Sequence, residues 1–127
     1  MSTIVFSHAN SFPASTYRVL FGHLEARGFT VKALEMVGHD TRYPVTNNWP
    51  QVVQQLIDFT SAAVAQTGKP VWLVGHSLGG FLSVMAASRN PELALGVVLV
   101  DSPILGGWRA KALSVAKRAQ LVGSISP

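Results

Sequence analysis

The residues with the clearest chemical potential are Gly75-His76-Ser77-Leu78-Gly79, which form a Gly-x-Ser-x-Gly motif. An apolar run, Val71–Val74, precedes the motif, and a second apolar segment begins at Phe81. In a tight strand-to-helix turn with this spacing, the serine hydroxyl points outward as a nucleophile. Glycine is then needed at 75 and 79, because neighbouring chain leaves no room for a Cβ. The first amides of the following helix would stabilise a developing negative charge. The motif therefore predicts a nucleophilic serine, Ser77.

A glycine-rich turn between a strand and a helix has other uses. It can serve packing alone, or it can hold a phosphate. A dinucleotide-binding turn has the pattern Gly-x-Gly-x-x-Gly and a P-loop has Gly-Lys-Ser/Thr, and neither pattern is present here. The apolar strand before the motif and the apolar helix after it favour the nucleophile turn.

The elements that must position Ser77 alternate along the chain. Short apolar runs predict buried strands, and apolar residues at helical spacing predict helices between them. The strands are expected at 4–6, 29–34, 71–74 and 95–100, and the helices at 14–26, 52–64, 79–89 and 108–122. This alternation predicts an α/β fold, a mostly parallel sheet with helices on both faces. Ligands bind beyond the carboxyl ends of such strands, so the segments after Phe6, Val74 and Val100 are expected to form the site.

The length and composition of the chain exclude several classes of protein. The chain has 127 residues, of which 48% are hydrophobic and 13% charged, so it fits one folded domain and not a disordered chain. Cysteine is absent, which excludes disulfides, a thiolate nucleophile and cysteine-ligated metals. The first residues lack the pattern of a signal peptide, and no apolar stretch reaches the length of a membrane span. A cytoplasmic location is therefore expected.

The formal net charge of +4 is unevenly placed. Basic and acidic residues balance over 1–103, and the excess lies in 104–127, which has no acidic residue. These four basic residues are Arg109, Lys111, Lys117 and Arg118. A basic end fits contact with nucleic acid or a membrane. A solvated helix face is favoured instead, because the charges form no stripe and only Trp108 accompanies them. No nucleic-acid partner is expected, and a basic-tailed adaptor is a minor alternative.

Four segments resemble the α/β-hydrolase superfamily of serine esterases and lipases. They match its nucleophile elbow, its oxyanion loop after the first strand, its loop after the second strand and its strand after the nucleophile helix. In that order the segments are Gly75–Gly80, Ser7–Pro13, Val37–Asp40 and Val98–Pro103. The resemblance covers residues 3–103 and identifies 1–103 as the N-terminal part of a hydrolase core. Residues 104–127 are then expected to be the start of a lid or a C-terminal helix.

The resemblance implies a set of site residues. Ser77 would attack an acyl carbonyl, and the oxyanion would be held by the Leu78 N–H and by a donor that, by position, is Asn10. A plain turn role for Asn10 is also open, since Ala9 replaces the family's usual glycine. Most relatives place the catalytic acid after a later strand, beyond these residues, and a minority place it where Asp101 stands. A non-catalytic loop cap with Ser102-Pro103 is the favoured role of Asp101. No metal and no organic cofactor are implied.

The catalytic histidine that the resemblance requires comes late in the chain, after the acid. No histidine follows His76 in this sequence. The resemblance makes His8 and His76 structural, His23 lies within a predicted helix as a surface or boundary residue, and His39 is expected near the site rim. We therefore expect the general base to be absent and the 127 residues to be a fragment with little activity.

The sequence thus predicts a serine hydrolase that acts on an ester or related acyl bond of a small molecule through Ser77, inactive as this chain. A non-catalytic hydrolase-fold binding domain is the alternative. The substrate is not determined by these residues, because one fold serves many chemistries. The resemblance also implies that the second, first, third and fourth strands lie side by side in that order. With no later strand expected, the Val97–Val100 strand would be an open edge for self-association.

Overall fold

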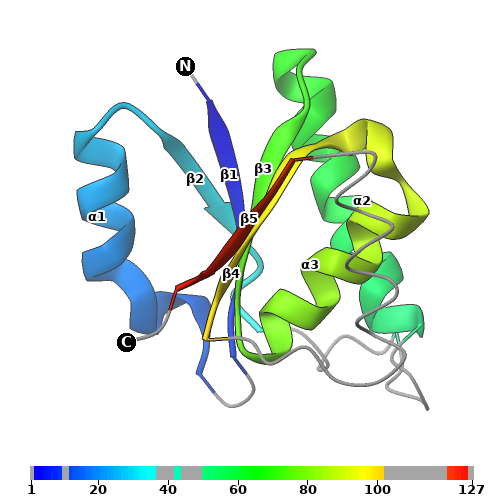
Figure 1. The fold of residues 1–127 in the computed structure, drawn as a ribbon, viewed down its shortest axis with the longest axis horizontal. Coiled ribbons are helices and arrows are strands. Elements are labelled where there is room, and N and C mark those ends of the chain that lie inside the picture. Colours follow the sequence, from blue (N-terminus) through cyan, green and yellow to red (C-terminus); the bar gives the residue numbers. More distant parts are fainter. Residues whose placement is uncertain (1, 10–11, 37–41, 44–49, 102–119, 126–127) are drawn as a thin grey trace.

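The computed structural model describes residues 2–9, 12–36, 42–43, 50–101 and 120–125 (Figure 1). The strands are β1 (Thr3–Ser7), β2 (Thr30–Ala33), β3 (Val71–His76), β4 (Ala94–Val100) and β5 (Gln120–Ile125). The helices are α1 (Arg18–Ala26), α2 (Pro50–Thr67) and α3 (Leu78–Arg89), with short 3-10 turns η1 (Ala14–Tyr17) and η2 (Pro91–Leu93). The expected elements up to residue 100 are therefore confirmed, with small shifts at their ends.

The five strands form one sheet in the order β2-β1-β3-β4-β5, and every pair of neighbours is parallel. The expected order of the first four strands is confirmed, and β3, which leads into the Gly-x-Ser-x-Gly turn, is the central strand. In the register of the sheet, Ser7 lies beside Gly75, and His76 lies beside Val100. The carboxyl ends of β1, β3 and β4 therefore meet where Ser77 stands.

Helices cover both faces of the sheet, as the predicted fold class requires. Figure 1 shows α1 on one side and α2 with α3 on the other. Side chains alternate along β1, so Val5 packs into the cluster that contains α2 and α3 while Ile4 and Phe6 pack into the cluster that contains α1. The chain is an α/β fold with a parallel sheet between two helical layers.

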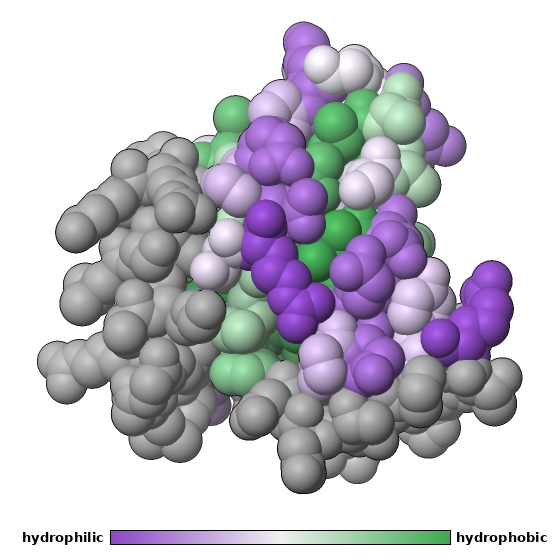
Figure 2. Space-filling model, turned by 90° about the vertical axis from the view of Figure 1, so that its right-hand side faces the viewer, coloured by the Kyte–Doolittle hydropathy of each residue, from purple (hydrophilic) through white to green (hydrophobic). Residues whose placement is uncertain are grey.

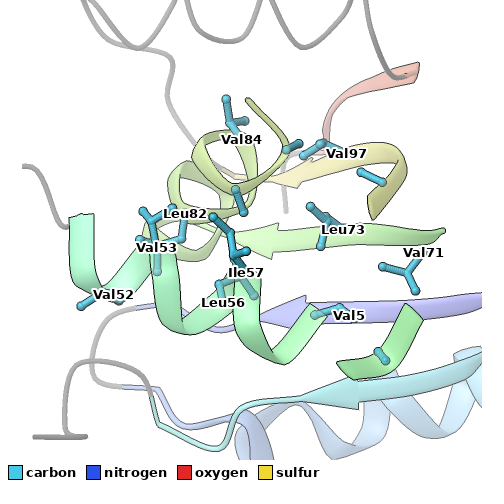
Figure 3. Close-up of a cluster of buried hydrophobic side chains, with 14 of the residues drawn as sticks. Val5, Val52, Val53, Leu56, Ile57, Val71, Leu73, Leu82, Val84 and Val97 are labelled. Carbon is cyan, nitrogen blue, oxygen red and sulfur yellow. The ribbon is translucent and has the colours of Figure 1, made fainter. Parts of the chain in front are cut away.

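The core on the α2 and α3 side holds α3, the helix that follows Ser77, in place. Val5, Leu73 and Val97 from the sheet meet Leu56 of α2 and Leu82 of α3 there (Figure 3). Each of these five side chains is at most 1% exposed. The outer surface on this side is mostly hydrophilic, with hydrophobic side chains showing between the polar ones (Figure 2). Because the side chains of α3 pack into this core, the packing also determines the position of Ser77, which directly precedes α3.

The α1 side is an aromatic layer. The ring of Phe6 lies 4.6 Å from the Tyr17 ring and 5.1 Å from the Phe21 ring, measured between centroids. Leu24 of α1 packs against the same cluster. Tyr17, Phe21 and Leu24 recur at the spacing that predicts a helix, and the face that they share packs against β1.

The expected helix over 108–122 is wrong at its end, because residues 120–125 form strand β5. This strand pairs with β4 in parallel, from Gly96 beside Gln120 to Val100 beside Ile125. An unpaired β4 edge would leave backbone N–H and C=O groups without partners, and pairing with β5 satisfies them. The β-branched Val122 and Ile125 also suit a strand better than a helix. The open edge expected at Val97–Val100 is therefore closed by β5.

Residues 102–119, which hold the basic cluster and most of the expected lid, lie outside the described residues.

Removal of β5 is expected to make the chain self-associate. Deleting residues 120–127 exposes the outer edge of β4, and an apolar parallel edge templates pairing with another chain. Gel filtration should then show dimers or larger species. Deletion of residues 126–127 alone keeps β5 and is the matched control. Identical elution of both variants as monomers would show that β5 does not protect this edge.

Candidate active site

Ser77 occupies a one-residue turn between β3, which ends at His76, and α3, which begins at Leu78. Its backbone has φ 53° and ψ −114°, and the side chain is half-buried. A positive φ is sterically costly for a residue with a side chain, on the order of 1–3 kcal/mol, and persists only where the surroundings impose it. A serine held in such a strained strand-to-helix turn has the geometry of a nucleophile elbow.

The glycines of the motif make close approach possible. A Cβ on Gly75 would fall well within 3.0 Å of the Gly79 carbonyl, and one on Gly79 would collide in the same way with the carbonyl of Ser7. Real Cβ atoms essentially never come so near to backbone. The expectation that neither position tolerates a Cβ is confirmed. The start of α3 therefore rests directly on the end of β1.

The start of α3 supplies amide groups beside Ser77. Leu78 is the first residue of the helix, and the first N–H groups of a helix have no partner within it. A hydrogen bond closes the first turn of α3: the Gly80 N–H donates to the carbonyl oxygen of Ser77 over 2.9 Å. This placement agrees with a Leu78 oxyanion donor, whose role stays a prediction. Asn10, the expected second donor, lies outside the described residues.

Asp101 directly follows β4, next to the end of β3. The Ser77 N–H donates to the carbonyl of Val100 over 3.1 Å, so the backbones at 77 and 101 leave adjacent strand ends. Asp101 is exposed and has φ 49°. Aspartate tolerates the left-handed region better than most residues, which gives Asp101 a conformational role at this turn. A catalytic role for Asp101 stays a prediction.

The loop after β1 is tied to the turn at Ser77 by a side chain that sequence reasoning missed. The Ala9 N–H donates to the Tyr17 hydroxyl over 3.0 Å, and that hydroxyl lies 2.7 Å from His76 Nδ1. In the sequence Tyr17 falls within the helix expected at 14–26, and no site role was predicted for it. The available signal was its type, because a buried tyrosine usually finds a partner for its hydroxyl.

Three of the four histidines lie in the described part of the chain. His8 is 1% exposed, and its Nδ1 lies 2.6 Å from the carbonyl of Ala9 in the same loop. His76 contacts Tyr17, and His23 is exposed on α1. His39 lies outside the described residues. Among the described residues, His23 therefore lies on the surface of α1, and His8 and His76 make side-chain contacts at the ends of β1 and β3.

A comparison with protein families decides the identity of the fold. The sequence model described as "Alpha/beta hydrolase family" matches residues 4–125. The chain belongs to this family. The match extends through the residues of β5, the last strand of the described sheet. The parallel α/β fold agrees with this family.

Two curated relatives of this hydrolase chain are named as a monoglyceride lipase or as a homolog of one. A monoglyceride lipase homolog from Monkeypox virus is 25% identical over 128 residues, a match that covers 98% of this chain and 46% of the viral protein. The monoglyceride lipase of Rattus norvegicus is 26% identical over 128 residues, covering 98% of this chain and 42% of the rat enzyme. The chain thus spans less than half the length of the curated relatives it matches.

Solved structures show the same fold. A "probable hydrolytic enzyme" from Pseudomonas aeruginosa PAO1 superposes with a TM-score of 0.65 at 30% identity, covering 86% of this chain and 35% of that one. Over the described residues of the hydrolase chain, no helix combines the length and apolar character that crossing a membrane demands.

Proposed function

We propose that this chain carries the nucleophile of a serine hydrolase that cleaves an ester or related acyl bond through Ser77. The observation that carries the proposal is the strained one-residue turn at Ser77, with φ 53° and glycines on both sides packed against backbone. A packing-only turn has no need of a side chain at its strained residue, since glycine would adopt this conformation at lower cost. Membership of the hydrolase family supports the same role.

The proposed reaction proceeds through an acyl-enzyme. The Ser77 Oγ attacks the carbonyl carbon, the carbonyl oxygen becomes an oxyanion, and the alcohol leaves as the acyl group is transferred to the serine. The Leu78 N–H and a donor assigned by position to Asn10 stabilise the oxyanion. Water then releases the acid and restores the serine. Asp101 is a candidate acid, and we assign the base to a histidine outside these 127 residues.

The names of the relatives support a class of substrate. The rat relative is by name a monoglyceride lipase, and the viral relative is by name a homolog of that enzyme. A glycerol monoester of a fatty acid is therefore the first substrate to offer a longer form of this chain. The fold alone does not select a substrate, because the residues that line a substrate pocket differ widely within one fold.

A non-catalytic binding domain is the second candidate function. It is favoured by the absence of any histidine after His76 in the sequence. It is also favoured by the places of His8 and His76, which contact Ala9 and Tyr17. In this case the turn at Ser77 would remain as a structural feature without turnover.

Covalent labelling of Ser77 tests the proposal. An alkyl fluorophosphonate reacts when Oγ forms a bond to phosphorus and the phosphorus–fluorine bond breaks. We expect mass spectrometry of the purified chain, after hours with the probe, to find the adduct on Ser77 ahead of every other serine. The Ser77→Ala variant should lose this adduct, and Ser61→Ala, which changes an exposed serine on α2, should keep it. Equal, slow labelling of all serines would favour the binding domain.

A further inference from the structure

We propose that Tyr17 is a positioning residue that holds the loop after β1 in register with the nucleophile turn. This inference rests on the proposed function of Ser77. Tyr17 belongs to the 3-10 turn η1, and it reaches two segments that flank the candidate site. One is the loop that follows β1, and the other is the end of β3, where His76 is the residue directly before Ser77.

The hydroxyl of Tyr17 bridges these two segments. It accepts the Ala9 N–H over 3.0 Å and lies 2.7 Å from His76 Nδ1, a residue 59 positions away in the sequence. Both hydrogen bonds are partly buried, so water competes for them less than at the surface. One oxygen atom therefore sets the spacing between the oxyanion loop and the strand that carries the nucleophile.

The pattern of donors and acceptors suggests a direction for this chain of bonds. A phenol has one proton to donate and lone pairs that accept. The Tyr17 oxygen accepts the Ala9 N–H, and we infer that its own proton goes to His76 Nδ1, an arrangement that uses both a lone pair and the proton. His76 then accepts at Nδ1 and carries its own proton on Nε2, and the NMR experiment below tests this tautomer.

Packing holds the Tyr17 ring so that its hydroxyl has one place to go. The ring centroid lies 4.6 Å from that of Phe6, 6.2 Å from that of Phe21 and 5.7 Å from that of His76. None of these ring contacts needs the oxygen. Replacement of Tyr17 by phenylalanine therefore keeps the packing and removes only the bridge.

The bridge acts on both segments that flank Ser77. The Ala9 N–H donates to Tyr17, so it is not available to an oxyanion beside Ser77. At its other end the bridge holds His76, the residue directly before Ser77. Loss of the bridge would loosen the end of β3 and so weaken the placement of Ser77 without changing Ser77 itself.

The test uses Tyr17→Phe in the full 127-residue chain, with Tyr43→Phe as the matched control. Tyr43 is the other of the two tyrosines, and its hydroxyl donates to Asp58 of α2. Nitrogen NMR of the His76 ring reports the tautomer, hydrogen exchange reports the Ala9 amide, and fluorophosphonate labelling reports Ser77. In Tyr17→Phe we expect His76 to lose its single tautomer and the Ala9 amide to exchange about fivefold faster. We expect the labelling rate of Ser77 to fall by roughly tenfold or more, and Tyr43→Phe to change none of the three.

A second pair of variants separates positioning from packing. His76→Asn keeps an acceptor near the place of Nδ1, and His76→Ala removes it, so labelling should be retained better in His76→Asn. Unchanged Ala9 exchange and an unchanged tautomer in Tyr17→Phe would overturn the bridge, whatever Ser77 does. A broken bridge with an unchanged labelling rate would make Tyr17 merely structural. Absence of any Ser77 label, both in the unmodified chain and in a longer form that includes a later histidine, would instead refute the proposed function, and the positioning role with it.

Discussion

Replacing Gly79 with alanine is expected to abolish the native fold. The new Cβ would collide with the carbonyl group of Ser7 and lie 2.8 Å from the carbonyl oxygen of His8. These atoms are backbone, and β1 is held between β2 and β3, so it has no room to retreat. We expect a loss of more than about 4 kcal/mol in the free energy of unfolding, which exceeds what most single substitutions cost. Urea denaturation followed by circular dichroism, together with soluble yield, measures it.

Gly22→Ala is the matched control for this substitution. Gly22 lies inside α1, and a Cβ there would have no atom within 4 Å among its neighbours. Alanine should therefore stabilise the helix by about 0.5–1 kcal/mol. Both substitutions change glycine to alanine, but only at Gly79 would the new Cβ meet the backbone of another segment. Similar unfolding curves for both variants would show that α3 does not rest on β1 in the way described.

The second large effect concerns turnover. The 127-residue chain is expected to hydrolyse p-nitrophenyl acetate no faster than its Ser77→Ala variant. A serine without its general base loses roughly four to six orders of magnitude in rate. The two histidines at the strand ends are held by Ala9 and Tyr17, and His23 is exposed on α1. Initial rates of both purified proteins at equal concentration, with the uncatalysed rate subtracted, test this.

Ordinary esterase rates that vanish in Ser77→Ala would contradict this expectation. A base within the 127 residues would then be required, and His39→Gln and His8→Gln would identify it. A longer form of the protein that includes a later histidine should be active, and its Ser77→Ala variant should not. That pair of proteins separates a missing base from a serine that is not a nucleophile.

The sequence by itself determined the elements through residue 100 and the turn at Ser77. The apolar runs that end at Phe6 and Val74 are short, so burial in a parallel sheet accounts for them. The strand, the Gly-x-Ser-x-Gly motif and the apolar helix follow one another directly, and this local pattern predicted the glycines at 75 and 79. The structure identified what Gly79 approaches, which is the distant carbonyl of Ser7.

Only the tertiary structure decided β5 and the Tyr17 bridge. The segment 120–125 has too few apolar residues to distinguish a helix from a strand, and the unpaired edge of β4 selects the strand. Likewise, nothing near Tyr17 in the sequence indicates His76, which lies 59 residues away. The parallel crossover places them together, since β1 and β3 are neighbours and α1 packs on the face they share. Partners of this kind are fixed by which strands pair, and strand pairing is a property of the whole folded chain.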